Sequence, residues 1–269
     1  MPGERFREPI HALSLHGVII LTKPELPNVE KESANIRSRL ISIIVPVLNE
    51  AASIDRFLKR LGERTGRAEV IVVDGGSSDG TFDLAQNHCD RCLHATRGRA
   101  AQMNAGARAA SGDTLWFLHA DCEVPAGCLE QISNALRDPQ VVGGFFRISI
   151  PNKRVVYRLT DSLAHYAGLL LRMRFGDHGF FCRRTAFEEI GGFPEVPLME
   201  DAEFFCKLRR LGRIAIISSR LISSPRRYEK IGPWRLTLTY GLIALLYQLR
   251  VPIPVLAGIY RRTCAQLRV

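Results

Sequence analysis

The feature that most constrains the fold is a regular alternation of short apolar runs and helical stretches that begins at residue 40. The apolar runs are rich in Val, Ile and Leu, as expected for strands that are buried on both faces. This alternation is typical of parallel βαβ units, so the fold class that we expect is α/β, with a Rossmann-like nucleotide-binding sheet that is mostly parallel. The expected strands are residues 40–46, 69–74, 91–95, 114–118 and 141–150, and the expected helices between them are residues 50–63, 98–110 and 125–137.

The second half of the chain has a more mixed pattern. Residues 152–174 are expected to form a long helix, and residues 175–184 a glycine-containing loop that enters a strand. A further helix is expected to end at Leu211, and two short strands, residues 214–218 and 220–223, to close the sheet. The expected organisation is a disordered tail over residues 1–38, one domain over residues 39–225 and a basic, amphipathic helical segment over residues 226–269.

Two carboxylates stand at the carboxyl ends of expected strands, where ligands bind in open α/β sheets. Asp74 ends the strand at residues 69–74, and Asp121 follows the strand at residues 114–118. Taken alone, Asp121 is more simply explained as a residue that caps the following helix. The sequence has no Gly-x-Gly-x-x-Gly after the first strand and no Gly-x-x-x-x-Gly-Lys-Ser/Thr, which argues against a dinucleotide-binding domain and a P-loop NTPase.

Positive charge is concentrated at the C-terminal end. The chain has a formal net charge of +10, and residues 204–269 hold 13 Lys and Arg residues against one acid, Glu229. A basic segment of this kind favours nucleic acid, an anionic membrane surface or an anionic ligand as partner. No helix-turn-helix, zinc-finger or aromatic RNA-binding pattern accompanies the charge in the sequence, so we do not expect a nucleic-acid partner.

Within this basic segment, residues 234–249 read as an apolar helix. Its uncharged run is too short to span a membrane comfortably. Basic residues on both sides favour a helix that lies at the surface of a membrane, as a peripheral contact with lipid phosphate. The alternative is a terminal helix that packs on the domain and presents a solvated basic face.

The seven cysteines are scattered, which suits a reduced, cytosolic chain better than a disulfide framework. Cys89 and Cys92, with a histidine on either side, form a Cys-x-x-Cys pair that zinc binds in other proteins. A second pair of ligands is not evident in the sequence, so the zinc hypothesis stays open.

Four motifs in this order resemble the family 2 glycosyltransferases of GT-A fold. They are residues 46–50 (PVLNE), 73–81 (VDGGSSDGT), 119–121 (HAD) and 200–201 (ED). A bacterial subgroup of uncharacterised members that act on lipids or the cell envelope is the closer resemblance. Its marks are residues 97–106 (RGRAAQMNAG), 176–179 (GDHG) and 226–230 (RRYEK).

The resemblance implies a site for a nucleotide-diphosphate sugar, linked to UDP or GDP. The Asp74 carboxylate would accept a hydrogen bond from a ring N–H of the base, and the turn that contains Asp79 would shape the pocket. Arg97 and Arg99 are expected to bind the nucleotide or its phosphates, since a guanidinium pairs well with anionic oxygens, although they also fit a solvated helix start. The full set of expected donor residues is Pro46, Asn49, Glu50, Asp74, Gly75, Ser77, Asp79, Arg97, Arg99, His119 and Asp121.

Asp121 corresponds to the last residue of the Asp-x-Asp motif of the family, which implies that it binds Mg²⁺ or Mn²⁺. His119 stands where the motif has its first Asp, and this departure bears on the choice of nucleotide. Asp201 corresponds to the general base of inverting members, which takes the proton from an acceptor hydroxyl. The other residues that we expect on the acceptor or phosphate side are Asp177, His178, Glu200 and Arg227.

The function implied is the inverting transfer of one sugar to a hydroxyl or carboxylate of a lipid-linked or other apolar acceptor. Ser224 and Tyr228 depart from the Gln-x-x-Arg-Trp motif of processive members, which disfavours a polymer synthase. The expected location is the cytoplasmic face of a bacterial-type membrane, or the cytoplasm if the C-terminal segment only packs on the domain. Two alternatives stay open: an inactive, membrane-associated protein that binds nucleotide sugars, and a sugar nucleotidyltransferase.

Overall fold

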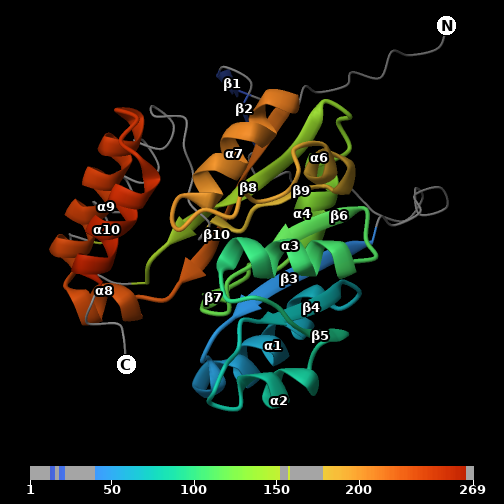
Figure 1. The fold of residues 1–269 in the computed structure, drawn as a ribbon. Coiled ribbons are helices and arrows are strands. Elements are labelled where there is room, and N and C mark those ends of the chain that lie inside the picture. Colours follow the sequence, from blue (N-terminus) through green and yellow to red (C-terminus); the bar gives the residue numbers. More distant parts are fainter. Residues whose placement is uncertain (1–12, 16–17, 22–39, 152–156, 158–177, 265–269) are drawn as a thin grey trace, which may run out of the picture.

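The computed structural model describes residues 13–15, 18–21, 40–151, 157 and 178–264 (Figure 1). Ten strands form one sheet with the order β1-β2-β10-β8-β9-β6-β3-β4-β5, and β7 pairs with β10. The strands are β1 (Leu13–Leu15), β2 (Val18–Leu21), β3 (Ile41–Val47), β4 (Glu69–Asp74), β5 (Arg91–His94), β6 (Thr114–Phe117), β7 (Cys122–Glu123), β8 (Val141–Ser149), β9 (Phe181–Arg183) and β10 (Arg213–Ser223). The helices are α1 (Ala51–Thr65), α2 (Thr81–Gln86), α3 (Arg99–Ala109), α4 (Cys128–Ala135), α6 (Arg184–Glu189), α7 (Glu200–Leu211), α8 (Arg226–Ile231), α9 (Pro233–Gln248) and α10 (Ile253–Thr263).

The parallel part of the sheet is the nucleotide-binding half that the sequence predicts. β6, β3, β4 and β5 lie side by side and run in parallel. Every residue of β3 is buried, because helices cover both faces of the sheet at this strand. The expected fold class, an α/β protein with a mostly parallel Rossmann-like sheet, is confirmed.

Two helical layers enclose the sheet and define two separate apolar cores. α1 and α4 bury Ile54, Phe57 and Ile132 on one face. α3, α6 and α7 bury Met103 and Phe204, among others, on the other face. These layers bring the first turns of α1, α3 and α7 to the edge where β3, β4 and β6 end, and this is the edge that a ligand would reach.

Gly106 explains how closely α3 lies on the sheet. A Cβ atom at this position would lie 2.5 Å from the Cγ2 atom of Ile44 on β3 and 3.0 Å from the Cγ2 atom of Val73 on β4. Only a residue without a side chain therefore allows the helix to approach the two strands to this distance.

The C-terminal part of the sheet differs from the expectation. The two short strands expected at residues 214–218 and 220–223 are one strand, β10, with a register shift between Ile217 and Arg220 where it pairs with β8. A bulge of this kind bends a strand without ending it. This explains why the polar residues at this position were predicted to separate two strands. β10 also lies inside the sheet, between β8 and β2, and does not close it.

The remaining expectations for this half have mixed outcomes. The strand that the loop at residues 175–184 was expected to enter is present as β9, at Phe181–Arg183, and runs antiparallel between β6 and β8. The helix expected at residues 152–174 lies outside the described residues, apart from Tyr157. β1 and β2 lie within residues 1–38, which were expected to be a disordered tail, and β2 runs parallel to β10. The other residues of that segment are outside the described part, and the domain boundaries stay a prediction.

The C-terminal helices α8, α9 and α10 form a group beside α7 and the end of β10 (Figure 1). Met199 and Ala202, at the start of α7, share an apolar cluster with Ile243 of α9 and Leu256 of α10. Within the described residues, none of the helices combines the length and hydropathy that a membrane span needs.

Candidate active site

The loops after β3 and β4 are tied together by four hydrogen bonds. The Asn49 N–H donates to Ser77 Oγ at 2.9 Å, and the Ser78 N–H donates to Asn49 Oδ1 at 2.9 Å. Asn49 has a φ of 54°, a left-handed conformation that asparagine tolerates better than most residues. The Glu50 N–H donates to Thr81 Oγ1 at 2.8 Å, and the Ala51 N–H to Asp79 Oδ2 at 3.0 Å. Distant residues of the Gly-Gly-Ser-Ser-Asp-Gly-Thr turn therefore satisfy backbone donors at the start of α1.

Asp79 holds this arrangement as an ionised group. Burial acts to raise the pKa of Asp79, but hydrogen bonds from the Thr81 hydroxyl and from the backbone N–H groups of Ala51 and Thr81 bring the net pKa below its ordinary value. Asp79 thus helps to fix the conformation of the two loops. A contact of Asp79 with a nucleotide stays a prediction.

Asp74 is fully buried, and its carboxylate is engaged by the turn that follows it. Its Oδ2 atom accepts hydrogen bonds from the N–H groups of Gly76 and Ser77, both at 2.9 Å, and its Oδ1 atom accepts one from the Ser77 hydroxyl. The Nδ1 atom of His94, at the end of β5, lies 3.5 Å from Oδ2. Asp74 therefore fixes the turn, and its expected bond to a nucleobase stays a prediction.

Gln102, on α3, is a part of this edge that the sequence reading did not single out as a site residue. Its buried side-chain amide donates to the carbonyl oxygens of Val47 and Val73, both at 2.8 Å. A Cβ atom at Gly75 would lie 3.1 Å from the same amide group. Gln102 thus joins the ends of β3 and β4 beneath the loops, where Pro46, in β3 next to Val47, is also buried. The signal in the sequence was a glutamine on the apolar face of an Ala- and Gly-rich helix.

Arg99 connects the start of α3 with the start of α7. Its Nη1 atom lies 3.6 Å from Glu200 Oε1 and 4.0 Å from Asp201 Oδ2. Both acids are more than 90% buried in the first turn of α7, where the helix dipole and the nearby guanidinium favour negative charge. Met199, with a φ of 70°, directly precedes the helix. Arg97, two residues before Arg99, is exposed.

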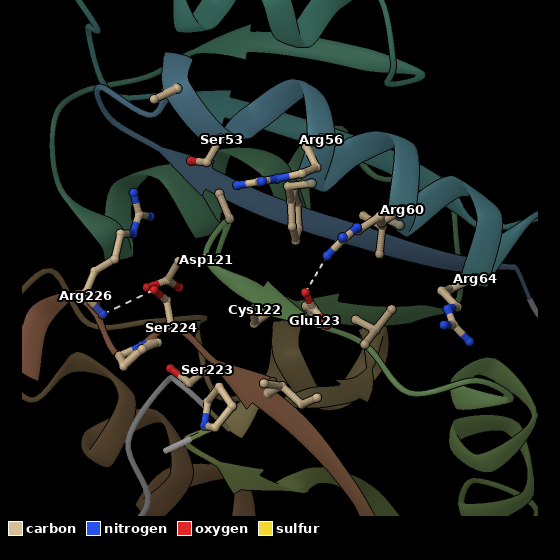
Figure 2. A pocket seen from close by; sticks show the side chains of 18 of the residues that line it. Ser53, Arg56, Arg60, Arg64, Asp121, Cys122, Glu123, Ser223, Ser224 and Arg226 are labelled. Carbon is tan, nitrogen blue, oxygen red and sulfur yellow. Dashed lines mark hydrogen bonds and ion pairs between the residues drawn. The ribbon is translucent and has the colours of Figure 1, made fainter. Parts of the chain in front are cut away.

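His119 and Asp121 follow the buried end of β6, and both are half-buried. The end of β10 holds this loop in place: Cys122 and Glu123 pair with Ser223 and Ile222, and the Ser224 N–H donates to the Asp121 carbonyl oxygen at 3.1 Å. The Asp121 carboxylate lines a cleft of about 880 Å³ between α1 and the end of β10 (Figure 2).

The residues present fit a metal ion that is held largely by a ligand. Among the described residues, no group of three or more His, Cys, Asp or Glu side chains could hold a metal ion, which includes the region of Cys89 and Cys92. Asp121 supplies one hard, accessible oxygen ligand of the type that Mg²⁺ and Mn²⁺ prefer. Phosphate and water oxygens would have to complete the coordination of an ion there.

Arg226 reaches the loop after β3, whereas Arg227 contacts α9. Arg226 Nη2 lies 3.1 Å from Glu50 Oε2, so the start of α8 is joined to the loop that precedes α1. Arg227 Nη1 donates to the Tyr240 hydroxyl of α9 at 3.3 Å. The sequence prediction named Arg227, the second residue of the Arg-Arg pair, and the spatial arrangement adds Arg226 to the candidate site.

Of the two site residues expected just after residues 152–174, the structure describes one, His178. His178 is buried, its Nδ1 atom lies 3.0 Å from the Phe146 carbonyl oxygen, and its ring packs edge-on against Phe145. It does not belong to the described lining of the cleft. Asp177 lies outside the described residues.

Comparisons with known proteins place this edge in context. The family model described as glycosyl transferase family 2 matches residues 42–191. Glycosyltransferase AglE of Haloferax volcanii is 30% identical over 169 residues, which are 57% of this chain and 56% of that protein. A 4,4'-diaponeurosporenoate glycosyltransferase of Staphylococcus haemolyticus is 25% identical over 71% of this chain and 52% of its own length. The chain thus spans about half the length of these two curated relatives.

A solved structure shows the same fold. It is the mannosyltransferase PcManGT from Pyrobaculum calidifontis in complex with GDP-Man and Mn²⁺, with a TM-score of 0.58, 24% identity and coverage of 84% of this chain and 73% of that chain. The matched residues 42–191 hold β3, β4, β6 and the loops that carry Asn49, Asp79 and Asp121. The chain belongs to glycosyl transferase family 2.

Proposed function

We propose that this protein transfers one sugar, with inversion, from a UDP- or GDP-linked donor to a hydroxyl or carboxylate of a lipid-linked or other apolar acceptor at a membrane surface. The observation that carries the proposal is that Arg99 lies close to Glu200 and Asp201, at the edge of the sheet where the parallel strands end and their loops begin. A buried carboxylate at this edge suits a group that takes a proton from an acceptor.

The donor would lie across the loops after β3, β4 and β6. Hydrogen bonds that involve Asn49, Ser77 and Asp79 tie the loops after β3 and β4 together, which favours the binding of a base and ribose without a large rearrangement. Mg²⁺ or Mn²⁺, when bound at Asp121, would neutralise the charge that develops on the leaving nucleotide diphosphate. The Mn²⁺ and GDP-Man in the solved structure of the same fold support this assignment.

Asp201 would act on the acceptor. It is 5% exposed, so water competes little for its carboxylate, and a hydroxyl that reaches it loses its proton as its oxygen attacks the anomeric carbon. An acceptor carboxylate is already deprotonated and needs only to be oriented. One relative is named as a glycosyltransferase of 4,4'-diaponeurosporenoate, which is consistent with such an acceptor.

The apolar acceptor and the membrane surface are supported by α9. This helix packs on the start of α7 with one side, and Tyr247 donates a hydrogen bond to Glu203, two residues after Asp201. Its other side exposes a row of large apolar side chains, which we call the α9 face: Trp234, Leu238, Leu242, Leu245 and Leu249. Exposed Arg235 and Arg250 lie at its two ends. Apolar residues flanked by arginines are typical of a helix that lies at a lipid interface.

Replacement of Asp201 by Asn tests the catalytic part of the proposal. The variant keeps the shape of the side chain and loses its basicity, so we expect nucleotide-sugar binding within about twofold of wild type and a rate of transfer to a hydroxyl acceptor lower by about 10²- to 10⁴-fold. Asp83→Asn, on the exposed side of α2, is the matched control and should leave both unchanged. Turnover at the wild-type rate in Asp201→Asn would show that the base assignment is wrong.

A further inference from the structure

Most of the residues that line the cleft beside α1 lie outside the expected donor site. Among the described residues that line it, Asp121 alone belongs to the expected donor set, and none comes from α3 or α7. The walls are one side of α1, the β7 segment and the end of β10 with the start of α8. The cleft therefore begins at the expected metal ligand and extends along α1, away from the loops after β4.

Three arginines from α1 share the wall of this cleft. Arg56, Arg60 and Arg64 follow one another at intervals of four residues, so they lie on one side of the helix, and Figure 2 shows all three on the cleft side. Asp55 and Lys59 of the same helix, which are not part of the lining, pair with each other at 3.0 Å. Glu63, an acid of the same helix, also belongs to the lining, so three basic residues of α1 face the cleft against one acid.

Two of these arginines have no carboxylate partner within the described part of the chain. Arg60 pairs with Glu123 across the cleft, and Arg226 from the opposite wall pairs with Glu50. Neither Arg56 nor Arg64 forms a hydrogen bond or an ion pair with another described residue. Guanidinium groups that face a concave, polar space bind phosphate oxygens well, because their N–H groups match the geometry of the anion.

The spacing indicates a ligand with more than one charge. At a rise of 1.5 Å per residue, Arg56 and Arg64 are about 12 Å apart along the helix axis, with Arg60 between them. A single phosphate reaches one or two of these groups, whereas a diphosphate or a phosphate ester with a second anionic group reaches more of them.

We propose that the cleft is a second anion-binding site, for a phosphate-bearing ligand other than the nucleotide donor, and that Arg56 and Arg64 are its binding residues. The ligand is a soluble phosphate compound or a phospholipid head group, which share this chemistry. The inference does not depend on the proposed transfer reaction, because it rests on the cleft and its charges alone.

The test uses inorganic pyrophosphate as the probe, in EDTA so that no divalent metal ion takes part, with isothermal titration calorimetry on the full chain. We expect the double variant Arg56→Gln/Arg64→Gln to bind pyrophosphate about tenfold more weakly. Lys59→Gln, on the other side of the same helix, is the matched control and should bind as wild type does. Glu123→Gln removes a repelling charge and releases Arg60, so it should bind about two- to threefold more tightly.

Vesicle co-sedimentation separates the two sources of phosphate. Weaker pyrophosphate binding in the double variant supports a soluble ligand. Weaker binding of phosphatidylglycerol vesicles, with no change for phosphatidylcholine vesicles and no pyrophosphate binding by wild type, supports a head group. If the double variant matches wild type with both probes, the proposal is wrong. It is also wrong if pyrophosphate binding is lost in Arg99→Gln and kept in the double variant, which would assign the probe to the donor site.

Folding and donor binding are checked on the same samples. The replaced side chains are exposed, so circular dichroism and the midpoint of urea unfolding should be those of wild type. Mn²⁺-dependent UDP or GDP binding should also persist in the double variant. A failure of the anion site is therefore distinguishable from a failure of the proposed transferase function.

Discussion

Asp79 accepts a hydrogen bond from the backbone N–H of Ala51 at 3.0 Å, across 28 residues of sequence. The side chains of most helix-capping residues lie next to the helix that they cap, whereas this one comes from the turn after the neighbouring strand. The bond makes the first turn of α1 and the turn after β4 a single unit at the edge of the sheet. The loops after β3 and β4 are thus ordered by the sheet and by each other.

Removal of the Asp79 carboxylate should therefore affect both stability and donor binding. Asp79→Ala leaves backbone donors of α1 and α2 without their partner, and we expect the free energy of unfolding to fall by about 1 kcal/mol. Because the pKa of Asp79 is lowered in the folded protein, its contribution is fully present above the unfolded-state pKa of about 3.9 and is lost as the pH falls through the folded-state pKa. Urea titrations at several pH values should show a constant difference near neutral pH that shrinks below about pH 4. Asp83→Ala, on α2, should show no such difference, and an equal loss at all pH values in Asp79→Ala would contradict an ionic role.

Asp121 should be needed for metal-dependent donor binding. With a single protein carboxylate at the ion, Asp121→Asn should weaken Mn²⁺-dependent binding of UDP or GDP by at least about tenfold in calorimetry. Asp113→Asn is a matched change just before the opposite end of β6 and should bind as wild type does. Equal Mn²⁺-dependent affinity in Asp121→Asn and wild type would remove Asp121 from the metal site.

The α9 face should bind lipid. Leu238 and Leu242 are 68% and 47% exposed, and their burial in a bilayer surface would stabilise the bound state. Leu238→Glu/Leu242→Glu should lower co-sedimentation with anionic vesicles by at least about tenfold while the far-UV spectrum stays unchanged. Leu84→Glu, an exposed leucine on α2, serves as the control. If the double variant still binds vesicles, or if wild type elutes as a dimer and the variant as a monomer, the face serves another purpose.

Gly106 and Gly62 should respond in opposite directions to the same substitution. A Cβ atom at Gly106 would lie 2.5 Å from Ile44, so Gly106→Ala should lower the free energy of unfolding by about 1–3 kcal/mol. Gly62, inside α1, has nothing within 4 Å of a built Cβ atom, and Gly62→Ala should raise the free energy of unfolding by about 0.5–1 kcal/mol. Thermal unfolding of the pair measures both, and a stabilised Gly106→Ala would contradict the close packing of α3.

The sequence by itself determined the βαβ half of the fold. β3, β4 and β6 are continuous apolar runs bounded by turn residues, and such runs are legible because each strand is buried on both faces by its own neighbours. The four motifs in their order also sufficed to indicate the family by resemblance. Within them, Asp74 and Asp121 stand at the carboxyl ends of strands, where ligands bind.

Tertiary structure alone decided how these residues are used. Two contacts join segments that are distant in the sequence: that of Arg99 with Glu200 and Asp201, and that of Arg226, rather than Arg227, with Glu50. β10 was also decided by contacts between distant segments. It continues through a register shift, and it lies inside the sheet because β2 pairs with its outer edge. A local pattern reports which face of an element is apolar, but it does not report which distant segment covers that face. The partners of a polar side chain depend on long-range packing, and this is why the sequence indicated the position of the candidate site and only the fold showed its contacts.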